Sequence, residues 1–270
     1  MRTATLYAAL MMFAATPALA QSQDCSNNAA GFPQWLEGVK KDAAAQGIGA
    51  RGLAALDGVS YDQNVISHDR GQKGTFKQSF EEFSGRMVND FRIKRGKQVI
   101  KKYQAVFDKA EADYGVQAPV IVALWALETD FGANIGKFDT VRSLATLAYD
   151  CRRPTQFRPE LFDALKIIDE GDVPAAEMKG AWAGEIGQVQ FLPSSYLQHA
   201  VDFDGDGRKD LVKDQADVIG SVAKYLADAG WQRGAGWDEG QPNFEALKSW
   251  NASEVYRKTI ALLADRIAGQ

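Results

Sequence analysis

The stretch PVIVALWALETDFG, residues 119–132, decides how this sequence is understood. Its first nine residues carry no charge, and Glu128 is the first ionisable residue after them. An apolar run of this kind predicts a helix in which the carboxyl group of Glu128 is withdrawn from water. Withdrawal from water disfavours the ionised form, so the pKa of Glu128 is expected above its ordinary value. Glu128 is therefore a candidate proton donor near neutral pH, with a Glu satisfied by a helix cap or a salt bridge as the alternative.

The first 20 residues have the pattern of a secretory signal peptide. Arg2 precedes an apolar stretch over residues 6–15, and small residues follow at Ala18 and Ala20, after which cleavage is expected. Cys25 lies too far from this point to be the acylated cysteine of a lipoprotein. No later stretch approaches the roughly 18 uninterrupted apolar residues that span a bilayer. The sequence predicts a soluble, exported protein of the periplasm.

Composition excludes some classes of function. The 31 Lys and Arg residues are outnumbered by 35 Asp and Glu residues, which gives a net charge of -4 and no concentration of positive charge for nucleic acid. After cleavage, about 250 residues remain, enough for one large domain or two smaller lobes. In an oxidising compartment the two cysteines, Cys25 and Cys151, are expected to form a disulfide.

The dominant hydrophobic period is helical, so a mainly α protein with little β structure is predicted. Besides the helix that precedes Glu128, helices are predicted over residues 32–46, 80–93, 98–114, 141–149, 159–170, 215–229 and 254–267. Strand signals are confined to residues 59–67 and the region around Trp237. Glycine-rich breaks at residues 71–74 and 230–240 predict mobile loops.

Two further blocks combine aromatic rings with side-chain amides. Residues 180–196 read GAWAGEIGQVQFLPSSY, in which Gln188 and Gln190 stand among aromatic residues, and residues 250–256 read WNASEVY. Aromatic faces and paired amides suit a sugar ring, and a proton donor is what the opening of a glycosidic bond needs. Taken alone, each block is equally well explained as a structural loop that leads into a helix.

Five motifs in order along nearly the whole mature chain carry a resemblance to a known family. They are ALETDFG (126–132), RSLATLAYD (142–150), GAWAGEIGQVQFLPSSY (180–196), VDFDGDGRKDL (201–211) and PNFEALKSWNASEVYRKTIALLADRI (242–267). Together they resemble the lytic murein transglycosylases of the membrane-bound B family, including its soluble members, which are similar to glycoside hydrolase family 103. The resemblance implies a mainly α fold with a lysozyme-like core over residues 116–270 and an additional N-terminal helical lobe over residues 21–115.

The resemblance also implies an enzyme that acts on peptidoglycan glycan strands. Such enzymes cleave the β-1,4 bond between N-acetylmuramic acid and N-acetylglucosamine and leave a 1,6-anhydro ring on the muramyl product. No cofactor is required for that chemistry, and proteins of cell-wall synthesis or division are candidate partners. Two alternatives stay open: a hydrolytic, lysozyme-like muramidase, and a noncatalytic scaffold that binds peptidoglycan.

Site residues follow from the resemblance position by position. The family's catalytic acid falls on Glu128, and its substrate contacts fall on Gln190, Phe191, Arg152, Arg153, Tyr225, Trp250, Asn251 and Tyr256. The chain departs from the family's pattern at Ala181, where a serine is frequent, and at Trp250, where a tyrosine is usual. Both departures concern subsite contacts and leave the acid in place.

The number of carboxyl groups bears on the reaction. A retaining or inverting hydrolase normally uses two carboxylates, whereas the transglycosylase mechanism implied by the resemblance needs one. Asp130 is two residues from Glu128 and would point away from it on a helix. Glu128 is therefore predicted to act alone, first as acid and then as base.

Residues 202–214 resemble a calcium loop, with acids at positions 1, 3 and 5 and glycine at position 6. Position 12 carries Lys213, whose ammonium group cannot ligate calcium. Two interpretations stay open: Asp214 closes a loop that is one residue longer, or the loop is structural without calcium. The resemblance implies that a structural calcium would be held by Asp202, Asp204, Asp206, the backbone carbonyl of Arg208, and Asp214.

Overall fold

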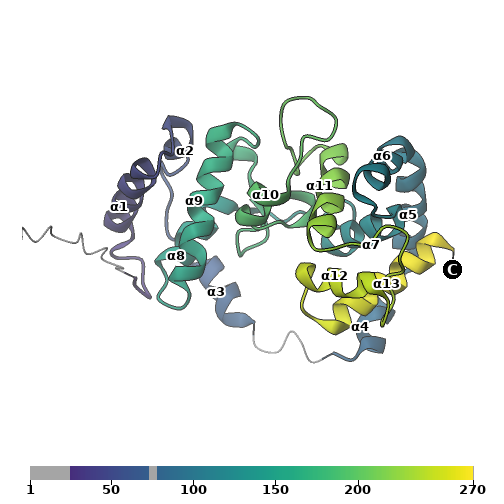
Figure 1. Ribbon diagram of the computed structural model, residues 1–270. Coiled ribbons are helices and arrows are strands. Elements are labelled where there is room, and N and C mark those ends of the chain that lie inside the picture. The colour runs from purple at the N-terminus through teal and green to yellow at the C-terminus, as the bar shows by residue number, and fades with distance from the viewer. Residues whose placement is uncertain (1–24, 73–77, 270) are drawn as a thin grey trace, which may run out of the picture.

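The structure, a computed structural model, describes residues 25–72 and 78–269 (Figure 1). The predicted signal peptide and part of the predicted loop at 71–74 lie outside these ranges. The described residues form thirteen α-helices, two 3₁₀ helices and one two-stranded sheet, which confirms a mainly α fold with little β structure. The helices are α1 (Phe32–Ala45), α2 (Ala50–Ala54), α3 (Gln63–Gly71), α4 (Phe80–Met87), α5 (Asp90–Lys102), α6 (Gln104–Tyr114), α7 (Ala118–Thr129), α8 (Thr140–Tyr149), α9 (Pro154–Glu170), α10 (Pro193–His199), α11 (Gln215–Asp228), α12 (Pro242–Trp250) and α13 (Glu254–Ala268), with 3₁₀ helices η1 (Ala175–Glu177) and η2 (Gly187–Val189).

Helix α7 lies at the centre of one group of helices because it is apolar on every side. All residues from Val120 to Leu127 are buried. Around α7 pack α13, α5, α6, α11 and η2. Burying each Val, Ile or Leu side chain contributes about 1.5–3 kcal/mol relative to exposure, so this run anchors the core. The buried helix predicted before Glu128 is present.

The helices that precede α7 in the chain pack as two groups. Helices α1, α2 and α3 contact α8 and α9, whereas α4, α5 and α6 contact α13, α7 and α11 (Figure 1). The predicted division of the chain at residue 115 stays a prediction.

Two predicted helices are each interrupted by one local feature. The predicted helix over residues 80–93 ends at Met87, because the Asn89 side chain accepts a hydrogen bond from the backbone N of Arg92 (3.0 Å) and caps α5. The predicted helix over residues 98–114 is divided at Tyr103, whose φ is -111°. Cap residues inside an amphipathic pattern thus divide it into shorter helices.

The predicted strands were wrong. Residues 63–71 form α3, which begins where the Asp62 side chain accepts a hydrogen bond from the backbone N of Asn64 (2.9 Å), and Trp237 lies in a loop. The observed strands, β1 (Phe138–Asp139) and β2 (Lys179–Gly180), are antiparallel and two residues long each. Such short strands have no periodic signal in a sequence.

The predicted disulfide between Cys25 and Cys151 is present. It ties the start of the described chain to the segment after α8, where the backbone N of Ser26 also bonds to the carbonyl oxygen of Tyr149 (2.9 Å). Because the cysteines are 126 residues apart, the chain-entropy account assigns the cross-link about 4–5 kcal/mol. None of the described helices has the length and apolarity needed to cross a membrane.

Candidate active site

Glu128 stands in the last turn of α7, and the backbone after it is held in place by side chains. Asp130, which ends the helix, adopts a left-handed conformation (φ 51°). Its Oδ1 accepts a hydrogen bond from Arg92 Nε (2.7 Å), and its Oδ2 accepts one from Asn134 Nδ2 (3.1 Å). A left-handed conformation is unfavourable for a residue other than glycine, and these two bonds help to offset that strain. Strained backbone that the surroundings hold is frequent at functional sites.

One oxygen of the Glu128 carboxyl group is engaged by two donors from the far end of the chain. Oε1 accepts hydrogen bonds from Trp250 Nε1 (2.9 Å) and from the Tyr256 hydroxyl (2.6 Å). Burial raises the pKa of Glu128, while these two bonds favour the carboxylate and oppose the rise. Because Oε1 already accepts two bonds, Oε2 is the oxygen that can carry a proton. The pKa of Glu128 is thus raised in the direction that the sequence predicts.

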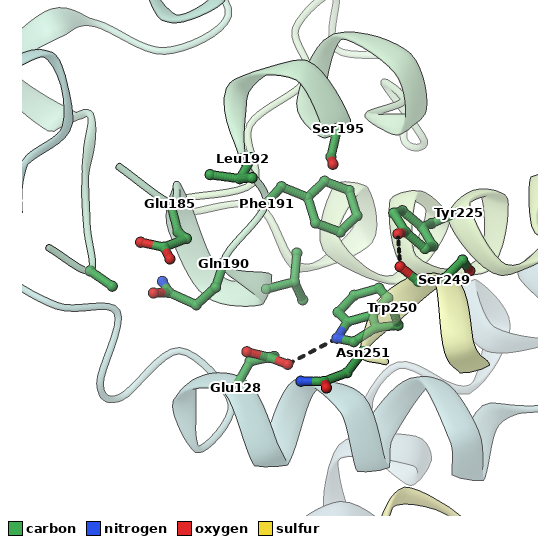
Figure 2. A pocket seen from close by; sticks show the side chains of 12 residues that line it. Glu128, Glu185, Gln190, Phe191, Leu192, Ser195, Tyr225, Ser249, Trp250 and Asn251 are labelled. Atoms are coloured by element: carbon green, nitrogen blue, oxygen red, sulfur yellow. Dashed lines mark hydrogen bonds between the residues drawn. The ribbon is translucent and has the colours of Figure 1, made fainter. Parts of the chain in front are cut away.

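Glu128 lines a pocket of about 530 Å³ whose wall is partly aromatic (Figure 2). The Tyr225 and Trp250 ring centroids are 5.0 Å apart, and each lies 5.5 Å from the Phe191 ring centroid. The Tyr225 hydroxyl donates to the carbonyl oxygen of Ser249 (2.7 Å), which fixes that ring. The pocket is lined by Glu128, Ala181, Glu185, Val189, Gln190, Phe191, Leu192, Ser195, Tyr225, Ser249, Trp250 and Asn251.

Gln190 enters the pocket from a constrained backbone. Its φ is 54°, and its Nε2 donates to the carbonyl oxygens of Ile135 (3.1 Å) and Gly187 (2.7 Å). The amide is therefore preoriented, with its nitrogen already used. Gln188, the other glutamine that the sequence offered for a sugar, is buried and receives a hydrogen bond from Trp125 Nε1 (3.1 Å). Gln188 thus joins α7 to η2 and does not line the pocket.

The structure brings most of the predicted site residues together. Six of them line the pocket, and Tyr256 reaches Glu128 from beside it, so Tyr256 positions the acid directly. The six are Glu128, Gln190, Phe191, Tyr225, Trp250 and Asn251. Trp250, predicted as a substrate contact, also hydrogen-bonds to the acid. Such a bond between segments more than 120 residues apart leaves no local pattern in the sequence.

Arg152 and Arg153 are not among the lining residues of this pocket. Both pair with Asp69, which is 1% exposed, and Arg70 pairs with Asp69 and Asp150. Burial disfavours the charge on Asp69, but hydrogen bonds from the three arginines prevail and lower its pKa. This ion-pair cluster joins α3 to the segment between α8 and α9. A substrate contact by Arg152 or Arg153 stays a prediction.

Glu185 is a pocket residue that sequence reasoning missed. It lines the same pocket as Glu128, and its Oε2 is buried without a hydrogen-bond partner among the described residues. Burial raises its pKa, backbone hydrogen bonds at Glu185 and Ala183 oppose the rise, and the charge of Glu128 adds to it. The signal was available: Glu185 is the single acid in the quoted block of residues 180–196, just as Glu128 follows an uncharged run.

The acidic loop after α10 gathers three carboxylates, but not the predicted set. One oxygen from each of Asp202, Asp204 and Asp217 lies within 4.8 Å of the others, and Asp206 and Asp214 are not in this group. Asp214 caps α11 by accepting from two backbone nitrogens, and its assignment as the closing ligand stays a prediction. Burial and neighbouring negative charges raise the pKa of Asp217 to about 6, although two backbone hydrogen bonds oppose the rise. Converging carboxylate oxygens are the ligand type that calcium prefers.

Tyr256→Phe is expected to raise the pKa of Glu128, because it removes a hydrogen bond that favours the carboxylate. The free energy of unfolding should fall by about 1–3 kcal/mol when Glu128 is ionised, since its Oε1 loses a donor. Glu128 has a raised pKa in the folded state, so the stability that it contributes is lost as pH rises through that value. Over the same pH range, the Tyr256→Phe variant should lose more of its free energy of unfolding than the unaltered protein.

The measurement is a carbon-13 NMR titration of the Glu128 carboxyl group, together with urea unfolding at pH 4 and at pH 8. Tyr225→Phe is the matched control, because that hydroxyl donates to the backbone at Ser249 and not to Glu128. An unchanged titration of Glu128 in Tyr256→Phe would contradict the role given to Tyr256.

Comparisons with known proteins agree with this geometry. The family described as "Transglycosylase SLT domain" matches residues 31–240. Membrane-bound lytic murein transglycosylase B of Escherichia coli (strain K12) is 42% identical over 135 residues, which are 49% of this chain and 37% of that relative's length. The chain thus spans less than half of this relative.

Two solved structures are similar over most of the chain. SltB3 from Pseudomonas aeruginosa, solved in complex with NAG-NAM-pentapeptide, is 30% identical with a TM-score of 0.84, covering 88% of this chain and 80% of that one. The lytic transglycosylase Slt35 of Escherichia coli, solved in complex with calcium, is 25% identical with a TM-score of 0.75, covering 89% and 93%.

Proposed function

The chain belongs to the transglycosylase SLT domain family, and we propose that it is a lytic transglycosylase of peptidoglycan with Glu128 as its acid and base. The substrate bond would be the β-1,4 link between N-acetylmuramic acid and N-acetylglucosamine. One observation carries the proposal: Glu128 lines the pocket with Oε1 held by Trp250 and Tyr256, which leaves Oε2 for the proton.

In the first step, Glu128 Oε2–H donates its proton to the glycosidic oxygen as the bond to the muramyl anomeric carbon breaks. Burial raises the pKa of Glu128 and so favours the protonated form that this step needs. The N-acetylglucosamine part departs with a new 4-hydroxyl group, and positive charge develops on the muramyl ring. The resulting carboxylate is stabilised where it stands, because Trp250 and Tyr256 already donate to Oε1.

In the second step, the Glu128 carboxylate takes the proton from the muramyl 6-hydroxyl, and O6 attacks the anomeric carbon. A 1,6-anhydro ring forms, Glu128 regains its proton, and no water is consumed. The substrate supplies the nucleophile, so one carboxyl group completes the cycle. The Tyr256 hydroxyl stays protonated throughout, because burial beside Glu128 raises its pKa well above the ordinary value.

The rest of the pocket suits a glycan. Phe191, Tyr225 and Trp250 present aromatic surface of the kind that packs against sugar rings, and Asn251 adds an amide beside Glu128 (Figure 2). Peptidoglycan as substrate is further supported by the relative that was solved with NAG-NAM-pentapeptide. The signal-like residues 1–20 support a periplasmic location, where glycan strands and proteins of cell-wall synthesis or division would be the partners.

A hydrolytic muramidase is the second candidate, because the pocket holds a second carboxyl group, that of Glu185. Most glycoside hydrolases use two carboxyl groups that flank the glycosidic bond, one as acid and one as nucleophile or base. The two candidates differ in product. Hydrolysis leaves reducing muramyl ends, whereas transglycosylation leaves anhydro ends that are lighter by one water.

Mass spectrometry of the muropeptides released from isolated peptidoglycan by residues 21–270 tests the proposal. Anhydro-muramyl products are the expected result. Reducing ends would assign the hydrolytic reaction instead. Sedimentation with the wall but no release would leave a binding protein.

We also propose a structural calcium ion at Asp202, Asp204 and Asp217. The three converging carboxylates fit a hard cation, and a calcium-bound relative has a similar fold. The ion would neutralise their mutual repulsion and hold the loop; no step of glycan cleavage runs through it. Asp206 and Asp214 of the predicted set lie outside this group of three.

Millimolar calcium is expected to stabilise the protein by about 1–3 kcal/mol, which is a rise of several degrees in Tm. Differential scanning calorimetry with calcium and with chelator measures it, and Asp202→Asn should abolish the rise. Asp57→Asn, on an exposed residue far from the loop in sequence, should keep it. The same Tm with calcium and with chelator in the unaltered protein would remove the ion from this account.

A further inference from the structure

The proposed reaction needs one carboxyl group, yet the pocket contains two. Figure 2 draws Glu128 on α7 and Glu185 on the loop before η2, and both side chains line the cavity. No step proposed for transglycosylation uses Glu185. Backbone hydrogen bonds at Ala183 and Glu185 favour its carboxylate, but Oε2 is left without a partner among the described residues, which is unfavourable for a buried polar atom and calls for an explanation.

The backbone holds Glu185 firmly in position. The backbone N of Ile186 donates to the carbonyl oxygen of Phe191 (2.7 Å), which closes the loop around η2. On the other side, a Cβ at Gly180 would lie 1.7 Å from the Glu185 carbonyl oxygen, so only glycine permits this approach. Glu185 is therefore presented to the pocket by a loop whose backbone is closely packed on both sides.

The pocket itself leaves Glu185 Oε2 without a partner. That oxygen is buried and makes no hydrogen bond among the described residues. Two polar side chains of the lining are used elsewhere: Gln190 Nε2 donates to two backbone carbonyl oxygens, and the Tyr225 hydroxyl donates to a third. Buried polar atoms in folded proteins are nearly always paired, so the missing donor or acceptor is expected from a molecule bound in the pocket.

We propose that Glu185 is a glycan-positioning residue, whose Oε2 forms a hydrogen bond with a hydroxyl or an amide group of the sugar in this pocket. The inference rests on the proposed function and deepens it, because it names a side chain that holds the substrate against Glu128. It applies to transglycosylation and hydrolysis alike, since both require the sugar to be oriented at the acid.

The two acids also influence each other's ionisation. The titratable residues of the lining are Glu128, Glu185 and Tyr225, and Tyr256 stands behind Glu128; within residues 25–72 and 78–269, no Lys or Arg lines the pocket. Besides burial, the charge of Glu128 raises the pKa of Glu185. Coupling between two sites is reciprocal, so Glu185, wherever it is ionised, disfavours the ionisation of Glu128 as well. Removing that charge should shift the proton loss of Glu128 to lower pH.

The first test measures binding without turnover. In a Glu128→Gln background, the tryptophan fluorescence change on adding a peptide-free tetrasaccharide of alternating N-acetylglucosamine and N-acetylmuramic acid gives Kd. Adding Glu185→Ala should weaken binding about 10-fold, because a hydrogen bond to a buried carboxyl group is lost. Glu111→Ala, on the exposed surface of α6, is the control and should leave Kd unchanged.

The second test uses the active protein. Glu185→Gln keeps the shape of the side chain and removes its charge, so the basic limb of the kcat/KM profile against pH should move to lower pH. Glu111→Gln changes the net charge equally and should leave the profile in place. A merely structural role for Glu185 would lower Tm in both Glu185 variants without moving the profile.

The outcomes separate this inference from the function on which it rests. If the Glu128→Gln protein does not bind the tetrasaccharide, the proposed function and this inference both fail. If it binds, and the Glu185 variants match it in Kd and match the unaltered protein in pH profile, only the inference is overturned. Weaker binding together with the shifted basic limb would establish Glu185 as a positioning residue.

Discussion

Glu128→Gln is expected to lower the turnover of peptidoglycan by about 10²- to 10⁴-fold while glycan binding persists. The amide cannot donate an acidic proton, but its oxygen can still accept from Trp250 and Tyr256, so the pocket keeps its shape. The muropeptide assay in its quantitative form measures the loss. Glu111→Gln should release products at the unaltered rate.

The same substitution should not destabilise the fold. Because burial raises the pKa of Glu128 in the folded protein, its contribution to stability is complete below the unfolded pKa of about 4.3 and is lost as pH rises through the folded value. Glutamine suffers no such loss. The variant should therefore be at least as stable as the unaltered protein at pH 8. Turnover by the variant within a few fold of the unaltered rate would reject Glu128 as the acid.

Asp69→Asn is expected to reduce the free energy of unfolding at neutral pH by about 3 kcal/mol. Asp69 is buried and pairs with Arg70, Arg152 and Arg153, so asparagine leaves three positive charges around a neutral group. The arginine side chains are between 31% and 43% exposed, and their access to water keeps the loss near the lower end for a buried ion pair. A drop in Tm of roughly 6–12 °C should follow.

The pH dependence distinguishes this ion-pair cluster from simple packing. The pKa of Asp69 is lowered in the folded protein, so its contribution is present above the unfolded pKa of about 3.9 and is lost as pH falls through the folded value. The difference between Asp69→Asn and the unaltered protein should shrink below about pH 4 in urea titrations. Asp57→Asn, which removes an exposed pair with Lys40, should lose at most about 1 kcal/mol. A comparably small loss for Asp69→Asn would mean that the cluster contributes no net stability.

The burial of Glu128 could be predicted from the sequence because the signal for it lies in the residues directly before it. Nine uncharged residues before Glu128 require a helix that is apolar on all sides, and the structure has that helix in the core. The helix boundaries around residues 88 and 103 were less accessible, because an amphipathic period continues across them. Asn89 was the available signal for the first boundary, since it is a favoured cap residue.

The hydrogen-bond donors to Glu128 could not be predicted from the sequence in the same way. Hydrogen bonds from Trp250 and Tyr256 to Glu128 depend on how α13 packs on α7, and no local pattern contains that packing. Likewise Asp217 replaces Asp214 in the carboxylate group, because α11 begins at a cap and turns its first buried acid toward the loop. Tertiary geometry, rather than residue type, decided both cases.

The separation in sequence between the acid and its donors has a temporal consequence. Trp250 and Tyr256 follow Glu128 by 122 and 128 residues. At roughly 5–20 residues per second, a ribosome needs about 6–24 s to extend the chain from Glu128 to Trp250. Throughout that interval the nascent chain contains the acid but neither its donors nor the aromatic wall that Trp250 completes. A bond-cutting site therefore cannot assemble on an unfinished chain, and synthesis itself delays its activity.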